Sequence, residues 1–300
     1  MTFLNISITP YSPEHKRTCD MLQNLQAGDL EKSIDQGGKG RTLKISKAVN
    51  GKFIFLKPKL PDGTEGRNYQ VIQKNPGISK WMPAIFGEIS INGKAFLVFE
   101  NIRKDGQGDE LAQVADIKLA GKTSELNNAI ASNREMKVTR GRHKTWHNKL
   151  WMKITTLLAP NFLLTNGGVR LIDYIRSKKI LQSSLKKTSP QSIQKLLKDL
   201  TQMKVDLKKS NFALIGASIA LIKEKDGSIR AVLIDPAHMQ CSKDLRSKAA
   251  KQIGEEQAKK VFFQDPVSSG KDEYELYKRS NEISLDAIIA SVKGVLRKHP

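Results

Sequence analysis

In two parts of the first hundred residues, apolar and polar positions alternate as they do in strands with one buried face. Each part holds two alternating segments separated by Asn-Gly, which favours a tight hairpin because both turn positions need a positive φ. The segments are 42–49 and 52–56 around Asn50-Gly51, and 84–91 and 94–100 around Asn92-Gly93. Residues 65–73 have a helical pattern with Tyr69 inward. The pattern predicts a small antiparallel lobe that carries one helix.

Strand and helix patterns are mixed in the following two hundred residues. The expected elements are a strand at 114–119, a basic helical tract at 127–153, and strands at 168–175, 212–223 and 228–234, with Asp226-Gly227 as the last turn. The Asp-Gly pair favours a hairpin for the same reason as Asn-Gly. These segments indicate a second, larger lobe that contains both strands and helices.

Two amphipathic helices complete the picture. One begins after Ser189-Pro190, and the other closes the chain with Ser284 as the expected N-cap. In both, apolar residues recur at the spacing of one helix face. We therefore expect an α+β protein with an N-terminal leader or helix at 1–35, a small lobe at 36–102 and a larger lobe at 103–300.

Positive charge is concentrated in the middle of the chain. The formal net charge is +21, and more than half of the excess falls in residues 101–200. A surface that is charged only for solubility would not be so uneven, so the distribution indicates a localised anion site. Nucleic acid, an anionic membrane or a phosphorylated small molecule are the candidate ligands at this point.

The cysteines and the apolar segments of the sequence indicate the cellular compartment. Cys19 and Cys241 fit neither a disulfide framework nor a zinc site. No apolar run has the length of a membrane helix, and the first residues lack the pattern of a secretory signal. We expect a soluble cytoplasmic protein; a protein that a bacterium delivers into a host cell would share these features.

Several charged residues stand at the ends of apolar strands, where a purely structural core would not place them. Lys57 ends a strand of the small lobe, Asp116 and Lys118 are two apart on one strand, and Asp235 ends another strand. Charges in such places are costly unless they are paired or bind a ligand. A Lys in one lobe and an Asp in the other suit phosphoryl transfer, in which the Lys neutralises nucleotide phosphates and the Asp holds Mg²⁺.

The order of these residues resembles that in the inositol polyphosphate kinases. The resemblance covers about 36 to 297 and rests on short segments in the family's order. They are Lys57-Pro58, Glu65 to Tyr69, Met82-Pro83 with Phe86-Gly87, Phe99 to Ile102, Ala112 to Ala120, Gly167 to Leu171, Gly216 to Ala220, and Ile234 to His238. The resemblance implies a two-lobed kinase-like fold.

Three positions depart from the family pattern. Ala112 and Ala120 stand where the signature Pro-x-x-x-Asp-x-Lys-x-Gly has its Pro and Gly, and Pro236 replaces a Phe beside Asp235. Proline fixes φ and removes an N–H, so the turn that aims Asp235 is expected to differ. The polar groups that the chemistry would use are all retained, which favours an active, divergent kinase.

The resemblance also implies a role for each site residue, with ATP and Mg²⁺ as cofactors. Lys57 would contact the ATP phosphates, Glu100 and the backbone of Ile102 would receive adenine, and Ser218 and Asp235 would hold the metal and phosphates. Asp116 would contact the ribose or the acceptor hydroxyl, Lys118 would bridge acceptor and transferred phosphate, and His238 would lie against the acceptor. The acceptor's phosphates would be bound within 122–187 by Lys122, Arg134, Lys137, Arg140 and Arg142.

Other functions stay open on the sequence alone. A catalytically silent relative would bind an inositol phosphate or ATP without transferring phosphate, and an active relative could act on an inositol lipid or a protein side chain. A polyanion-binding or nucleic-acid-binding protein would explain the charge, but aromatic residues make up only 6% and no nucleic-acid-binding motif is recognisable. Specific nucleic-acid binding is therefore not expected.

Overall fold

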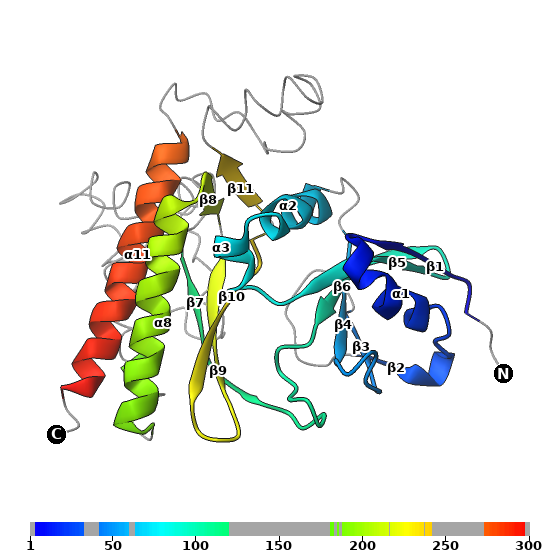
Figure 1. The fold of residues 1–300 in the computed structure, drawn as a ribbon, viewed down its shortest axis with the longest axis horizontal. Coiled ribbons are helices and arrows are strands. Elements are labelled where there is room, and N and C mark those ends of the chain that lie inside the picture. Colours follow the sequence, from blue (N-terminus) through cyan, green and yellow to red (C-terminus); the bar gives the residue numbers. More distant parts are fainter. Residues whose placement is uncertain are drawn as a thin grey trace, which may run out of the picture.

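The computed structural model shows an α+β protein with antiparallel sheets (Figure 1). It describes residues 4–32, 42–59, 64–119, 181–182, 185, 188–215, 217–236, 238–241 and 273–297. The expected helical tract at 127–153 and strand at 168–175 lie outside these residues. The expected α+β class is confirmed.

The N-terminal part is built on a six-stranded antiparallel sheet with the order β1-β5-β6-β4-β3-β2. Its strands are β1 (Ile6–Pro10), β2 (Leu30–Lys32), β3 (Leu43–Ile45), β4 (Ile54–Pro58), β5 (Ile85–Ile91) and β6 (Lys94–Glu100). Both Asn-Gly turns are confirmed, since Asn50, Gly51, Asn92 and Gly93 all have positive φ. The residues expected to form a leader supply β1 and β2 as well as α1 (Lys16–Leu22).

Helices cover both faces of this sheet. On one face α1 packs through Cys19 and Leu22 against residues that include Phe96 and Val98 of β6. On the other face α2 (Thr64–Gln73) packs through Tyr69 against Leu97 and its neighbours. Alternate residues of a strand point to opposite faces, and β6 is buried on both because each face has its own helix. A short helix, α3 (Pro76–Ser79), follows α2.

The C-terminal part has a three-stranded antiparallel sheet in the order β10-β9-β7. These strands are β7 (Ala112–Lys118), β9 (Ser218–Lys223) and β10 (Ile229–Ile234). Two long helices, α8 (Pro190–Lys209) and α11 (Glu273–Leu296), bury one of its faces in the largest core of the described residues. The expected helix after Ser189 is present as α8, and Ser189 caps it, with its side chain accepting a hydrogen bond from the N–H of Ser192 at 3.2 Å.

Two sequence expectations in this part are wrong. Residues 212–223 form two strands, β8 (Phe212–Ile215) and β9, and β8 pairs with β11 (His238–Cys241) in a separate sheet. Ser284 is no N-cap, because α11 already begins at Glu273; its hydroxyl is buried and donates to the carbonyl of Leu119. In the first half of α11, Lys278 and Asn281 bind backbone groups of β8, so polar residues of this helix are buried.

The link between the two parts passes beside the edge strand β10. The N–H of Leu233 donates to the carbonyl of Trp81 at 2.7 Å, and the Trp81 indole donates to Asp206 of α8 at 2.9 Å. The chain between α3 and β5 is therefore attached to the C-terminal sheet and helices. Among the described helices, none has a stretch long and apolar enough to cross a membrane.

Candidate functional site

The centre of the candidate site is a lysine held between two carboxylates from different parts of the chain. Lys57, near the end of β4, places its Nζ 2.6 Å from Oε1 of Glu65 and 2.7 Å from Oδ1 of Asp235. Glu65 lies in the first turn of α2 and is 2% exposed, whereas the Asp235 side chain is 51% exposed. The arrangement has a buried anchor on one side and an accessible carboxylate on the other.

An unusual backbone conformation precedes Pro236 at the end of β10. Asp235 follows the last residue of the strand and has a φ of 53°, in the left-handed region that Asp adopts more readily than most residues. Pro236 disfavours the right-handed helical region for the residue before it. With this turn, the Asp235 carboxylate reaches Lys57 of the N-terminal sheet.

Electrostatics keep the lysine in its charged form. Burial by itself lowers the pKa of Lys57, but the nearby carboxylates of Asp235 and Glu65 outweigh it and leave the pKa above its ordinary value of 10.5. Lys57 is therefore a fixed positive charge at neutral pH. Such a charge, next to an accessible carboxylate, suits the binding of an anion together with a cation.

Ser218 has a buried hydroxyl without a partner among the described residues. It is 1% exposed, and its Oγ forms no hydrogen bond there. In the sheet, Ser218 stands opposite Ile234 of β10 on one side and Lys118 of β7 on the other. Because Asp235 directly follows Ile234, the register brings the positions of Ser218, Lys118 and Asp235 to the same end of the sheet.

The remaining residues of the predicted catalytic set are described only by their backbone. Asp116 stands opposite Ala220 in the same pair of strands, two positions from Lys118. His238 opens β11 opposite Ile215, three residues after Asp235. The structure thus places Asp116 and Lys118 in the strand beside Ser218, while the sequence keeps His238 close to Asp235.

The face of the three-stranded sheet opposite the helices is apolar. Four buried residues form its centre, and Ile102 and Ile234 pack against them partly exposed. The four are Leu111, Ala220, Ile222 and Val232. Ser218 lies on the same face of β9 as Ala220 and Ile222, because alternate residues of a strand point to the same side. The apolar face therefore ends next to the polar residues at this end of the sheet.

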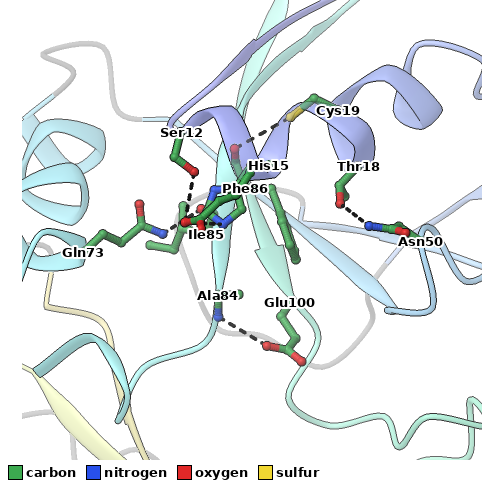
Figure 2. A network of polar contacts seen from close by, with 11 residues as sticks. Ser12, His15, Thr18, Cys19, Asn50, Gln73, Ala84, Ile85, Phe86 and Glu100 are labelled. Atoms are coloured by element: carbon green, nitrogen blue, oxygen red, sulfur yellow. Dashed lines mark hydrogen bonds and ion pairs between the residues drawn. The ribbon is translucent and has the colours of Figure 1, made fainter. Parts of the chain in front are cut away.

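At the connection between the two parts, the side chain of Glu100 is occupied by structural contacts. Its carboxylate accepts from the N–H of Ala84 at 3.3 Å (Figure 2) and from Lys52 at 3.0 Å. The carbonyl of Ile102 accepts from Arg230 at 3.4 Å. The N–H of Ile102 has no acceptor in the described part of the chain, which leaves it as a donor beside the apolar face.

Two further results concern the predicted site residues: five of them cannot be placed, and one residue of the site was not predicted. The expected acceptor-binding residues Lys122, Arg134, Lys137, Arg140 and Arg142 lie outside the described residues. Glu65 received no role from the sequence, although it is the partner of Lys57. The available signals were an acidic residue at the start of the helix that follows the Lys57 strand and its place in one of the segments that carry the family resemblance.

The described residues offer no complete metal site, and the pocket among them lies away from Lys57. In the described ranges, no group of three or more His, Cys, Asp or Glu could hold a metal ion. A pocket of about 580 Å³ lies along β10 and the Trp81 segment, and its lining includes none of the predicted site residues. A cation at this site would therefore need a ligand's own oxygens besides Asp235 and Ser218.

Comparisons with known proteins found similarity at the level of structure. No model of a known protein family matches the chain, and no curated protein matches it in sequence. Among solved structures, the chain is similar to the inositol phosphate multikinase Ipk2 from S. cerevisiae, determined in complex with ADP and Mn²⁺. That match has 16% sequence identity and a TM-score of 0.42, and it covers 79% of this chain and 98% of the other.

Proposed function

We propose that this protein is an ATP- and Mg²⁺-dependent kinase that phosphorylates a soluble inositol phosphate. The observation that carries the proposal is Lys57 of the N-terminal sheet, bound by buried Glu65 and by accessible Asp235 at the end of the C-terminal sheet. The charge pattern, the apolar face beside it and the motif order of the sequence support the same reading.

The nucleotide would lie between the two sheets. Lys57 stays protonated and is suited to contact phosphate oxygens, while Glu65 keeps its ammonium in place. The adenine ring would pack against the partly exposed Ile234 at the edge of the apolar face, with the N–H of Ile102 as a hydrogen-bond donor. The side chain of Glu100 would act indirectly, by holding the N–H of Ala84 at the start of β5.

The residues at the end of the C-terminal sheet fit a magnesium ion bound with a nucleotide. Asp235 offers an accessible carboxylate and Ser218 a hydroxyl without a partner among the described residues. Mg²⁺ is commonly bound by one or two protein oxygens together with phosphates and water. When bound, the ion would neutralise negative charge on the phosphates. Asp235 would turn its carboxylate to the cation, and Lys57 would remain held by Glu65.

The acceptor would be bound by the basic middle of the chain. In the sheet, Lys118 stands opposite Ser218 and Asp116 opposite Ala220. Asp116 would orient the acceptor hydroxyl, and Lys118 would contact the transferred group. Positive charge from Lys122, Arg134, Lys137, Arg140 and Arg142 would bind the acceptor's phosphates, and His238 would lie against it. Arg and Lys are the side chains that bind multiply charged phosphate esters.

The direct test is phosphoryl transfer to a panel of inositol phosphates. The purified protein is incubated with labelled ATP, Mg²⁺ and each acceptor, and the modified position is identified by NMR. Transfer to at least one acceptor, lost in Asp235→Asn, is the expected result. Failure with every acceptor, for a folded protein in the presence of metal, would overturn the proposal.

A silent relative is the alternative, because Pro236 departs from the family pattern beside Asp235, and Asp235 itself has an unusual backbone conformation. Such a protein would be stabilised thermally by an inositol phosphate without forming product. Its affinity for that ligand would also be the same in Asp235→Ala. The two functions are thus separated by whether the inositol phosphate that stabilises the protein is also phosphorylated in the transfer assay.

A further inference from the structure

A row of side chains runs across the N-terminal sheet beneath the first turn of α2. Lys57 of β4 stands opposite Leu97 of β6, and Leu97 stands opposite Glu88 of β5. Residues that oppose one another in antiparallel strands share a face of the sheet. Lys57 is thus at one end of the row, where it binds Glu65, and Glu88 is at the other end.

Tyr11 binds the Glu88 end of this row. Its hydroxyl donates to Oε1 of Glu88 at 2.7 Å, and the second oxygen of Glu88 pairs with Lys59. Burial, followed by the contact with Glu88, raises the pKa of Tyr11 far above its ordinary value. The phenol therefore stays protonated and remains a hydrogen-bond donor over the working pH range of the protein.

The same phenol lies against the helix that carries Glu65. A Cβ added to Gly66 would be 2.6 Å from Oη of Tyr11, 2.8 Å from Oε1 of Glu88 and 3.2 Å from Leu97. Gly66 directly follows Glu65, and α2 lies so close to the sheet here that a methyl group would require the side-chain ends of Tyr11 and Glu88 to move. Glu65 reaches Lys57 on one side of this contact, and Tyr11 reaches Glu88 on the other.

The N-terminal segment holds Tyr11 in place. β1 pairs with β5 over its whole length, and the N–H of Tyr11 donates to the carbonyl of Phe86 at 3.0 Å. The same carbonyl accepts a weak bond from the Cys19 thiol, and the His15 ring packs edge-on against Phe86 (Figure 2). The position of the phenol is therefore set by residues that come before the Lys57 strand.

We infer that Tyr11 is a positioning residue for the Lys57–Glu65 pair. Through Glu88 and Gly66, the N-terminal strand sets how closely α2 approaches the sheet, and this sets where Glu65 holds the lysine. Tyr11 touches neither nucleotide nor acceptor. The expected effect on catalysis rests on the proposed function. The expected effect on the position of α2 does not depend on it.

The test compares Tyr11→Phe with Ser12→Ala, which removes an exposed hydroxyl from the same segment. In Tyr11→Phe we expect the KM for ATP to rise about three- to tenfold, the effect of one lost hydrogen bond. The KM for the acceptor should be unchanged. Amide hydrogen exchange of residues 68–73 should be faster by a similar factor, while exchange in α8 keeps its wild-type rate. Ser12→Ala should match the wild type in every measurement.

Gly66→Ala provides the reciprocal change. Helix propensity alone would make this variant more stable, by about 1 kcal/mol, but the new methyl group meets Tyr11. We expect a raised KM for ATP and faster exchange in α2, both partly restored in the double variant Tyr11→Phe/Gly66→Ala. Absence of any recovery would show that the methyl group acts through Glu88 or Leu97 and would contradict the role of Tyr11.

The outcomes separate this inference from the proposed function. If the wild type transfers no phosphate, the kinase proposal fails, and the exchange rates of α2 still decide the role of Tyr11. If Tyr11→Phe changes neither the exchange of α2 nor the KM for ATP, the inference is overturned. Faster exchange throughout the protein, with an unchanged KM, would show a purely structural residue and overturn it as well.

Discussion

Lys57 and Asp235 are separated by 178 positions in the sequence, yet their charged atoms lie 2.7 Å apart. One belongs to the six-stranded sheet and the other follows the edge strand of the three-stranded sheet. Neither position is next to the other in any strand pairing. The contact thus depends on how the two sheets are placed together, and the proposed nucleotide site is built around it.

Replacing Lys57 should remove phosphoryl transfer. In Lys57→Met we expect kcat/KM to fall by about 10²-fold or more, because a preorganised charge at the phosphates is lost. Lys94→Met, at the exposed start of β6, is the matched control and should keep its activity. Wild-type rates in Lys57→Met would contradict the assigned site.

The same substitution also leaves Glu65 buried without its lysine. An uncompensated buried carboxylate costs about 3–5 kcal/mol of folding free energy. Combining Lys57→Met with Glu65→Gln should therefore recover part of the stability in urea unfolding but none of the activity. Recovery of both would place Lys57 in a purely structural role.

Ser218→Ala should affect stability and ligand binding in opposite directions. The buried Oγ has no partner among the described residues, so its removal is expected to leave the unliganded protein as stable, or more stable by about 1 kcal/mol. Affinity for Mg²⁺ and ATP together should fall by about tenfold, measured by calorimetry.

Ser291→Ala is the control for that pair of effects. The Ser291 hydroxyl is buried in α11 and donates to the carbonyl of Ala287 at 2.8 Å. Its removal should cost about 1 kcal/mol of stability without changing nucleotide affinity. If Ser218→Ala behaved in the same way, the hydroxyl would have no role in ligand binding.

Lys278 should be one of the most sensitive positions for stability. It is 9% exposed, and its ammonium donates to the carbonyls of Leu207 in the last turn of α8 and of Ser210 and Phe212 after it. Lys278→Met would leave these acceptors buried without a donor, at a cost of about 2–4 kcal/mol. Urea unfolding measures the loss, and exposed Lys293→Met in the same helix should show none.

Asp206 should contribute stability that is lost in acid. Burial raises the pKa of its carboxyl, but hydrogen bonds from Lys80, Trp81 and Gln202 outweigh it and place the pKa below the ordinary 3.8. The folded protein therefore favours the ionised form, so the contribution is present above pH 3.8 and declines as the pH falls below it. We expect Asp206→Asn to cost about 1 kcal/mol at pH 6 and clearly less at pH 3, measured by urea unfolding. An equal cost at both pH values would contradict this.

Local signals in the sequence were sufficient for the hairpins and for α8. Asn-Gly at 50–51 and 92–93 needs a conformation that few other pairs adopt, and Ser189-Pro190 combines a capping side chain with a residue suited to a first turn. Such features depend only on neighbours within a few residues. They were therefore readable without knowledge of the fold.

Where sequence reasoning failed, distant residues decided the structure. Helix α11 begins 11 residues before Ser284 because Lys278 and Asn281 bind backbone groups of α8 and β8, a role that makes their polar pattern look solvent-exposed. The segment 212–223 is divided because β8 pairs with β11 while β9 pairs with β7 and β10. The sequence of the segment does not show which strands its two halves pair with.

The sequence by itself determined the antiparallel α+β class, the turns, and the presence of Lys57, Ser218 and Asp235 at the ends or beginnings of apolar strands. Only the tertiary structure decided that Glu65 anchors Lys57, that Asp235 meets it with a left-handed backbone, and that Tyr11 lies against the helix of Glu65. The physical reason is how far apart in the sequence the interacting residues are. Turns and helix caps follow from steric limits and hydrogen bonds between near neighbours, whereas a charged cluster forms only where the packing of two sheets brings distant side chains together.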